Sequence, residues 1–457
     1  MQVYRRALFI FRRDLRLEDN TALNAALQQS ESVIAAFIFD PRQIDEHPYQ
    51  SQPGLQFMLQ ALSDLQQQLE AQQGKLFIFK SHASQLISEL RQETAFDAVF
   101  INRDYTPFSR QRDAEIELSC QQLGIDFHAY ADALLNEPEQ LLKADGRPYQ
   151  VFTPFYRRSA QNPVNTPVPL RSGHFVKESF TLESANTLSE LIHTNPYPFQ
   201  GGSRAAYAIL DNLAHCQFYS EQRDFPVSEA SSRLSAHLKF GCCSVRQAYF
   251  AVLQQLGAEH SLLRQFYWRD FFHHIAFHFP HVFGHAFDTR YDAIPWRRDE
   301  NDFWRWANGQ TGFPIVDAGM RQLNQTGYMH NRVRMITASF LTKDLHISWR
   351  WGERYFAQRL VDYDPCLNNG NWQWAASTGC DAQPYFRIFN PWLQQQKFDP
   401  DCRYIKQWIP ELRDLSPKAI HGWQSNPLVG EYPSPMLNHS ERSQTIKEWF
   451  KSAASVV

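Results

Sequence analysis

The chain has 457 residues, a formal net charge of −3 and a hydrophobic fraction of 43%. This length exceeds what one hydrophobic core usually supports, so we expect two domains. The nearly balanced charge excludes a uniformly basic surface, and any nucleic-acid site must be a local patch. Seven cysteines without a Cys-x-x-Cys pair argue against a disulfide framework and against a four-thiolate metal site.

No apolar run in the chain is long enough for a membrane span or for the apolar region of a signal peptide. We therefore expect a cytoplasmic protein with no membrane partner.

The first 130 residues alternate β-type apolar runs with amphipathic stretches. The runs at 7–11, 33–40, 75–80 and 96–102 predict strands, and residues 54–71 and 83–91 predict helices. This alternation is typical of an α/β domain with a doubly wound parallel sheet. The Gly-x-Gly-x-x-Gly fingerprint is missing after the first strand, so nothing here specifies a dinucleotide pyrophosphate.

Prolines become frequent and periodicity weak between residues 134 and 200, which we interpret as an interdomain linker. After Gly201 the apolar spacing is helical, as in 253–279, 318–345 and 350–361. The second domain is therefore predicted to be all-helical. All twelve tryptophans lie at or after Trp268, so we expect the two parts of the chain to have different roles.

Residues 362–397 gather acidic, amide and indole side chains in one stretch. Such a mixture is unusual for a plain core, since it can hold a polar ligand while an aromatic face meets a base or a flavin ring. On spacing alone, however, the better interpretation of Asp362 and Asp364 is that they are solvated loop carboxylates.

Several separate blocks of the chain resemble the photolyase and cryptochrome family, in the same order and over nearly the whole length. Within this family the chain is most similar to class I cyclobutane pyrimidine dimer photolyases. The resemblance implies light-driven repair of such dimers in UV-damaged DNA, by electron transfer from excited reduced FAD to a flipped-out dimer. The blocks are 9–20, 219–226, 231–235, 268–269, 312–321, 329–335, 362–397 and 408–412.

The resemblance also implies a division of the chain into an α/β antenna-binding domain at 1–133, the linker at 134–200, and a helical domain at 201–457 that binds FAD and DNA. The serines around Arg233 supply hydroxyl and guanidinium donors that suit a pyrophosphate, although an ordinary serine N-cap cluster is the alternative. The FAD ligands implied are Tyr219, Ser231, Ser232, Arg233, Leu234, Ser235, Asn331, Arg334, Asp362, Tyr363, Asp364 and Asn368. Of these, Asn368 matches the residue beside the flavin N5 edge, where an amide can both donate and accept.

Eight positions match family residues that contact DNA or the lesion, namely Arg223, Gln265, Trp268, Arg269, Asn331, Arg332, Trp374 and Gln394. Three indoles, those of Trp372, Trp349 and Trp296, match the chain that carries electrons from the surface to photoexcited oxidised flavin. Indole suits brief oxidation, but seven further tryptophans have the same chemistry and no matching role. We assign Trp304, Trp306, Trp351, Trp392, Trp408, Trp423 and Trp449 to the core or to interfaces.

The chain departs from the family pattern at the lesion site. Arg264-Gln265 stands where cyclobutane dimer photolyases have Asn-Glu, and a glutamine there is typical of 6-4 photolyases and many cryptochromes. Conversely, a 6-4 photolyase needs two histidines where this chain has Asn331 and Met335, and neither side chain can donate the required proton. We give the missing histidines more weight.

Three alternatives are kept open: a 6-4 photoproduct photolyase, a cryptochrome-like blue-light receptor, and a generic nucleotide-binding oxidoreductase, which would leave the C-terminal motifs unexplained. The chain lacks a long polar C-terminal extension, which favours repair over signalling. Phe108-Ser109 replaces the Asn-Glu of folate-binding antenna domains, and this segment resembles deazaflavin-type or antenna-poor members more closely. A second antenna chromophore is therefore possible, of the deazaflavin type rather than folate. We expect a monomer with no obligatory protein partner and no metal.

Overall fold

The structure is a computed structural model that describes residues 3–184, 186–192, 197–228, 230–381, 387–427 and 430–455. The chain divides into two compact units. The first unit consists of Met1–Tyr149, Thr153–Ala214 and Ser232–His278, and the second of Gln150–Phe152, His215–Ser231 and Phe279–Val457.

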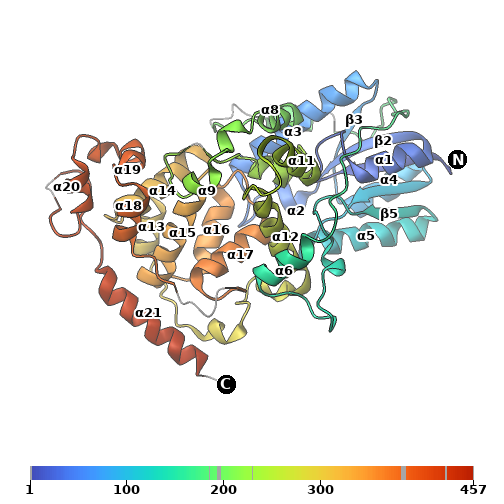
Figure 1. The fold of residues 1–457 in the computed structure, drawn as a ribbon. Helices are drawn as coiled ribbons and strands as arrows, with labels where there is room; N and C mark the ends of the chain where they lie inside the picture. The colour runs from blue at the N-terminus through green and yellow to red at the C-terminus, as the bar shows by residue number, and fades with distance from the viewer. Residues whose placement is uncertain are drawn as a thin grey trace. The chain divides into compact units, whose positions relative to one another are not determined.

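The first unit contains one sheet of five parallel strands (Figure 1). The strands lie in the order β3-β2-β1-β4-β5, which is a doubly wound arrangement with the chain reversing direction of travel after β3. Their bounds are β1 (Tyr4–Phe11), β2 (Ser30–Phe39), β3 (Leu76–Lys80), β4 (Ala98–Asn102) and β5 (Asp126–Tyr130).

Both faces of the central strands are buried, which explains their continuous apolar sequence. Leu8 and Ile10 of β1 share a hydrophobic cluster with Leu86 and Ile116, which belong to helices on one face. Phe9 points to the opposite face, because side chains alternate along a strand, and is fully buried there. The parallel register pairs Leu8 with Ile34 of β2.

Helices surround the sheet of the first unit. They are α1 (Thr21–Gln29), α2 (Pro41–Ile44), α3 (Gln52–Ala71), α4 (Ala83–Glu93), α5 (Pro107–Leu123), η1 (Pro138–Gln140), most of α6 (Phe152–Ser159), α7 (Thr187–Leu191), α8 (Ser203–Leu210), α10 (Ser235–Phe240), α11 (Val245–Leu256) and α12 (Leu263–His278).

The described part of the second unit contains helices and no strand of a sheet. Its core is rich in aromatic side chains, among them Trp306, Trp349 and Trp372. The helices are α9 (Tyr219–Gln222), η3 (Pro280–Val282), η4 (Thr289–Ala293), α13 (Glu300–Ala307), α14 (Pro314–Thr326), α15 (Asn331–Ser339), the π-helix η5 (Phe340–Asp344), α16 (Trp349–Arg359), α17 (Pro365–Ala376), α18 (Pro391–Phe398), α19 (Arg403–Trp408), η6 (Pro410–Leu412), α20 (Pro417–His421) and α21 (His439–Ala454), while η2 (Ala214–Cys216) spans the boundary.

The predicted fold class, a parallel α/β sheet followed by a helical part, is confirmed. Two of the stretches with helical spacing, 253–279 and 318–345, are mostly helical but are each divided into separate helices. The stretch 253–279 is broken between α11 and α12, where Gly257 has a φ of +94°, and 318–345 is broken after α14, where Gly327 has a φ of +70°. Glycine adopts such left-handed backbone without the strain of a Cβ atom, so each glycine ends a helix.

The compact units do not coincide with the predicted boundaries at residues 133 and 200. Residues 232–278, including α11 and α12, belong to the first unit. The expected linker, 134–200, carries α6 and α7 between irregular stretches. The functional domain limits stay a prediction, because compactness does not say which residues bind a ligand. Within the described residues, no helix has the length and apolar character needed to cross a membrane.

Candidate functional site

The loop that precedes α10 has the backbone shape expected of an anion-binding turn. Arg233 has a φ of +53°, in the left-handed region, and Leu234 follows in right-handed helical conformation as the N-cap of α10. Consecutive left- and right-handed residues turn their N–H groups toward the same side, which forms a concave donor site for phosphate. A non-glycine residue in this conformation costs energy and is often found at functional turns. Ser231 and Ser232 are half-buried, whereas Ser235 and Arg233 are exposed.

In the second unit, Arg334 and Asp362 form an ion pair across 28 residues of sequence. Nη2 of Arg334 lies 2.9 Å from Oδ2 of Asp362, and Nε donates to the carbonyl of Met329 at 2.7 Å. The guanidinium also lies 5.4 Å from the ring centroid of Tyr328, so three contacts fix its position.

The other carboxylate oxygen of Asp362 is a candidate ligand-binding atom. Oδ1 is buried and has no hydrogen-bond partner among the described residues. A buried carboxylate oxygen without a donor is costly, and the usual explanation is a ligand or a water molecule that supplies one. Hydroxyl and N–H donors of a ribityl chain or a purine fit this requirement, so this acceptor suits a flavin nucleotide.

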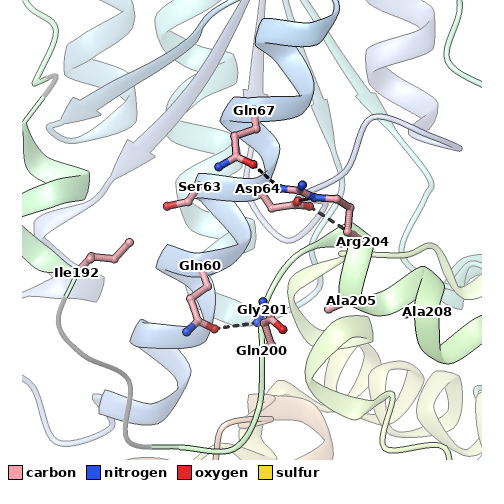
Figure 2. Close-up of a pocket in the computed structure, with 10 residues that line it drawn as sticks. All are labelled: Gln60, Ser63, Asp64, Gln67, Ile192, Gln200, Gly201, Arg204, Ala205 and Ala208. Atoms are coloured by element: carbon pink, nitrogen blue, oxygen red, sulfur yellow. Dashed lines mark hydrogen bonds and ion pairs between the residues drawn. The ribbon is translucent and has the colours of Figure 1, made fainter.

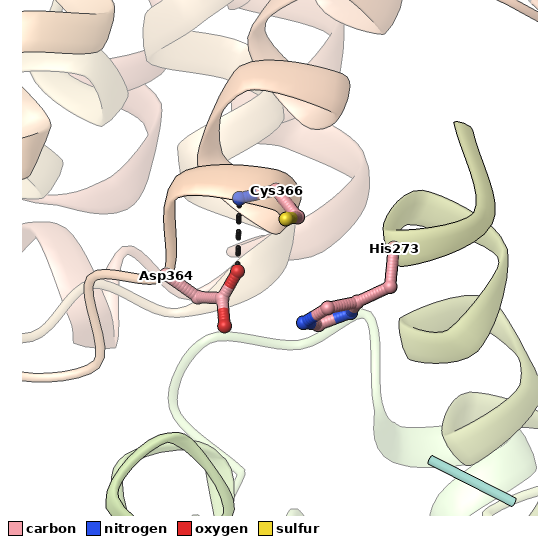
Figure 3. A group of neighbouring side chains, drawn as sticks. All are labelled: His273, Asp364 and Cys366. Atoms are coloured by element: carbon pink, nitrogen blue, oxygen red, sulfur yellow. Dashed lines mark hydrogen bonds between the residues drawn. The ribbon is translucent and has the colours of Figure 1, made fainter. Parts of the chain in front are cut away.

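Asp364 is already partly used within the protein. As the N-cap of α17, its Oδ1 accepts from the backbone N–H groups of Cys366 at 2.9 Å and Leu367 at 3.1 Å (Figure 3). Pro365 follows at the first helical position, where its fixed φ favours a helix start. The carboxylate thus sets where α17 begins, and α17 carries Asn368, Trp372 and Trp374. Tyr363, another expected ligand, precedes this cap and packs against the core.

Asn368 is held by the helix that faces it. Its Nδ2 donates to the backbone carbonyl of Glu353 on α16 at 2.9 Å, and the side chain is buried. This bond fixes which end of the amide faces α16, and therefore which end is presented to a ligand. Glu353 was missed by sequence reasoning, because a residue that acts through its backbone carbonyl leaves no signal in its side chain.

The three indoles expected to carry electrons lie in or against one core. Trp349 and Trp372 are buried in it, and the half-buried Trp296 packs against its edge. Gly352 lies one turn after Trp349 on α16, and a Cβ atom there would be 2.1 Å from the six-membered ring of Trp372. The glycine therefore lets α16 and the Trp372 indole approach closely. Nε1 of Trp296 is buried without a partner among the described residues.

Several of the residues expected to contact DNA belong to the second unit. Arg332 is paired with Asp224 at 2.6 Å and lies 4.5 Å from the ring centroid of Phe398, which orients the guanidinium. Arg223 lies 5.8 Å from the ring centroid of Tyr219. Asp224 was not expected in this role, although its position directly after Arg223 was a usable signal.

Three further side chains of this set belong to α15, α17 and α18. Asn331 is exposed at the start of α15, and Oε1 of the half-buried Gln394 has no partner among the described residues. The guanidinium of Arg387 lies 5.8 Å from the Trp374 ring centroid. Residues 382–386 of the 362–397 segment lie outside the described residues.

In the first unit, α12 carries the remaining predicted lesion contacts. Trp268 stacks on Phe272 with centroids 5.8 Å apart, and Gln265 lies half-buried one turn earlier. Nη1 of Arg269 donates to the carbonyl of Ala133 at 2.6 Å, so this arginine also ties α12 to the chain after β5. Next to it, burial raises the pKa of Asp270 to about 7, despite hydrogen bonds from the N–H groups of Leu135 and Asn136.

The carboxyl ends of the strands in the first unit carry another polar cluster. Oδ1 and Oδ2 of Asp104 accept from Arg13 at 3.3 Å and Ser109 at 2.8 Å. Burial opposes ionisation of Asp104, but the nearby arginines outweigh it and hold its pKa well below the usual value. The guanidinium groups of Arg42 and Arg112 lie 4.9 Å and 5.8 Å from the ring centroid of Phe108. Ligands of doubly wound sheets bind at this edge.

A cavity of about 630 Å³ lies between α3 and α8, and we do not assign a ligand to it (Figure 2). Several of its polar side chains already bond within the protein: Oε1 of Gln60 accepts from Gly201 N–H at 2.9 Å, and Asp64 accepts from Ser203 N–H at 2.8 Å. Arg204 pairs with Asp64 and Gln67 in the same cavity (Figure 2). These bonds secure the start of α8.

Comparisons with known proteins agree with the expected family. Residues 7–171 match the family described as DNA photolyase, and residues 262–452 match the FAD binding domain of DNA photolyase. A deoxyribodipyrimidine photo-lyase of a Synechococcus species is 37% identical, covering 98% of this chain and 97% of that one.

Solved structures give the same result. An archaeal photolyase from Sulfolobus tokodaii, described as containing two FAD molecules, is 43% identical with a TM-score of 0.89, over 98% of this chain and 100% of that one. A cryptochrome from Synechocystis is 29% identical with a TM-score of 0.89, over 97% of this chain and 98% of that one.

Proposed function

We propose, since this chain belongs to the photolyase and cryptochrome family, that it repairs cyclobutane pyrimidine dimers in UV-damaged DNA by light-driven electron transfer from reduced FAD. The observation that carries the proposal is the likeness to deoxyribodipyrimidine photo-lyases over almost the full length of both chains. A partial match would have left the lesion site or the cofactor site without support.

The residues present fit FAD by the chemistry of their donors and acceptors. We assign the pyrophosphate to the N–H groups and hydroxyls around Arg233, and the hydroxylated part of the cofactor to Asp362 Oδ1. Arg334 holds the Asp362 carboxylate in place through its hydrogen bond, and Asn368 presents its amide to the flavin ring. FAD supplies the electron that light promotes toward the dimer. The protein binds and orients the cofactor and the lesion and excludes water from them. No protein nucleophile or metal takes part.

For the lesion, we assign stacking contacts to Trp268 of the first unit and to Trp374 of the second, and phosphate contacts to Arg223 and Arg332. Flipping a dimer out of the duplex costs only a few kcal/mol because the lesion is already poorly stacked. An indole face then replaces the lost stacking, and guanidinium groups fix the strand by its phosphates. Arg332 is kept in place by Asp224 and Phe398 before DNA arrives.

We also propose an antenna chromophore at the strand ends of the first unit, of the flavin or deazaflavin type. The observation in favour is the aromatic and cationic cluster of Phe108, Arg42 and Arg112, which suits a flat, anionic ring system. Ser109 is bonded to Asp104 inside the protein, where a folate-binding domain has a glutamate. We propose a cytoplasmic monomer that needs no protein partner.

The decisive experiment is repair of an oligonucleotide that carries one defined lesion, either a cyclobutane dimer or a 6-4 photoproduct. Reduced protein is assayed with blue light and in darkness. Light-dependent restoration of the cyclobutane substrate alone is the expected result. Restoration of the 6-4 substrate would contradict the weight given to Asn331 and Met335, and repair of neither by a protein with bound, photoreducible FAD would favour the cryptochrome-like receptor.

A further inference from the structure

Besides Trp349 and Trp296, a second series of aromatic rings begins at Trp372 and ends at the surface of the second unit. The centroid of Trp372 lies 6.2 Å from that of Trp306, and Trp306 lies 5.8 Å from Tyr355. Tyr355 in turn lies 6.3 Å from Trp304. Phe303 makes a parallel connection, at 5.6 Å from Trp306 and 5.4 Å from Trp304. The rings therefore touch one another without a break.

The two ends of this series differ in their access to water. Trp372 is 2% exposed and Trp306 is fully buried, whereas Trp304 is 50% exposed. Trp304 and Trp306 lie two residues apart on α13, so the helix directs one indole outward and the other into the core. Asp299 caps this helix by accepting from Asp302 N–H at 3.0 Å, which fixes where α13 begins.

The buried indole is also held in one orientation. Nε1 of Trp306 donates to the backbone carbonyl of Thr337 at 3.1 Å, and its ring stacks on Phe356 with an interplanar angle of 8°. Tyr355 is fixed by a hydrogen bond from its hydroxyl to Oδ1 of Asn324 at 2.8 Å. Fixed rings in contact favour electron transfer, because its rate falls steeply with distance and little structural rearrangement is needed.

Water access decides where an oxidised indole can persist. An indole that has lost an electron becomes a strong acid at its N–H group and is stabilised when water takes the proton. Nε1 of Trp296 is buried and lacks a hydrogen-bond partner within the described part of the chain, so it has no acceptor at hand. The indole of Trp304 is half exposed, and water can reach it.

We propose that Trp306 and Trp304 form a second electron-transfer branch that serves photoreduction of the cofactor. This inference rests on the proposed function, because it requires bound FAD. In each turnover Trp372 loses one electron to the photoexcited oxidised flavin, Trp306 returns one electron to Trp372, and Trp304 returns one to Trp306. An external thiol then gives one electron to Trp304 and releases its proton, and two of the resulting thiyl radicals combine to a disulfide. Trp304 recovers its N1 proton from water. No covalent bond of the protein forms or breaks, and the thiol supplies the electron gained by the flavin.

Tyr355 and Phe303 serve as contacts in this branch and are not oxidised. Burial raises the pKa of Tyr355, and its hydroxyl donates to amide oxygens, which are poor proton acceptors. The guanidinium of Arg359 lies 5.5 Å from the same ring and disfavours a second positive charge on it. The electron therefore passes between the two indoles of α13.

The test compares photoreduction rates of holoprotein carrying oxidised FAD, in blue light with a thiol reductant. The variants are Trp296→Phe, Trp304→Phe and the double variant, with Trp408→Phe as a control because Trp408 is a half-buried tryptophan outside both series. We expect Trp296→Phe to retain a residual rate and the double variant to lose that residual rate. Trp408→Phe is expected to match the unmodified protein. A Trp296→Phe rate that Trp304→Phe does not lower further would overturn the branch.

A second measurement does not depend on enzyme turnover. The Trp296→Phe protein is illuminated in air without thiol, and oxygenated tryptophan is located by peptide mass spectrometry. Light-dependent oxygenation at Trp304 is expected, while equal oxidation in light and darkness would contradict the inference. Failure of the proposed function gives a different result. If the unmodified protein binds no FAD, or if its FAD is not photoreduced, the proposed function is refuted. If the unmodified protein is photoreduced normally and Trp296→Phe abolishes this photoreduction, only the branch is refuted.

Discussion

Buried carboxylates at the strand ends of the first unit and Asp362 of the second unit are treated differently by their surroundings. Asp132 accepts from Arg16 at 2.6 Å, from Arg246 at 2.8 Å and from the Thr21 hydroxyl at 2.7 Å, so both of its oxygens are bound. Asp362 has one oxygen on Arg334 and the other without a partner among the described residues. A fully bound carboxylate stabilises the fold, whereas one with an unused oxygen is available for a ligand. Burial alone does not distinguish the two.

The largest effect is expected at Asp132. Replacing it in Asp132→Asn removes the charge that compensates Arg16, which is 2% exposed, and lowers the free energy of unfolding by about 3–5 kcal/mol. The denaturant midpoint of the first unit, monitored by far-UV circular dichroism, measures this change. A change below about 1 kcal/mol would show that the neighbouring carboxylates of Asp14 and Asp19 are enough to compensate Arg16.

Asp270 sharpens the comparison, because its pKa is raised to about 7 from an ordinary 3.8 by burial. The folded state holds the Asp270 proton more tightly than the unfolded state does. The stabilisation from this proton is therefore complete below about pH 4 and is lost as the pH rises toward 7. Asp270→Asn removes this dependence, so its stability relative to the unmodified protein should increase with pH, by at most about 4 kcal/mol. Unfolding curves between these pH values test the sign. A relative stability that is flat or falls with pH contradicts it.

At Asp362 the effect should fall on the cofactor. Asp362→Asn keeps the shape of the side chain but turns a charge-assisted hydrogen bond into a neutral one, which weakens FAD binding by about 2 kcal/mol, or roughly thirtyfold. Titration of apoprotein with FAD measures the dissociation constant. Asp401→Asn, at an exposed carboxylate, is the matched control. Equal affinities in the two variants would remove Asp362 from the FAD site.

The smallest effect is expected at Gln265 on α12. Gln265→Glu restores a charged partner for the dimer and should tighten binding of the damaged strand by about 1 kcal/mol, or roughly fivefold. Binding to oligonucleotides with and without one cyclobutane dimer measures this difference. Gln121→Glu, an exposed position on α5, controls for the added negative charge. Weaker dimer binding in Gln265→Glu would mean that the glutamine is suited to a different lesion.

The sheet was predictable from the sequence because its central strands are continuous apolar runs. Helix α5 was missed, since its buried side chains include the polar Ser109 and Arg112, which hide the helical period. Strand β5 was missed because it is a polar strand at the edge of the sheet, with none of its residues fully buried. In both cases the tertiary surroundings, and not the local pattern, decide the structure.

The candidate site was predictable in its residue types but not in its contacts. Nothing in the sequence indicates that Arg334 reaches Asp362 or that one oxygen is left over. The Ser231–Ser235 loop was identified as a donor cluster, but the left-handed backbone of Arg233 is a property of the folded chain. Likewise, Trp304 and Trp306 have the same indole as every other tryptophan, and only their neighbours distinguish them.

The uneven distribution of tryptophan gives the protein a natural optical label. Eleven of the twelve indoles belong to the second unit, and Trp268 alone lies in the first. Intrinsic fluorescence of apoprotein therefore reports almost entirely on the helical core, while the parallel sheet unfolds nearly unseen by that signal. Comparing fluorescence with a probe of secondary structure would reveal whether the two units melt together or one after the other, without any engineered fluorophore.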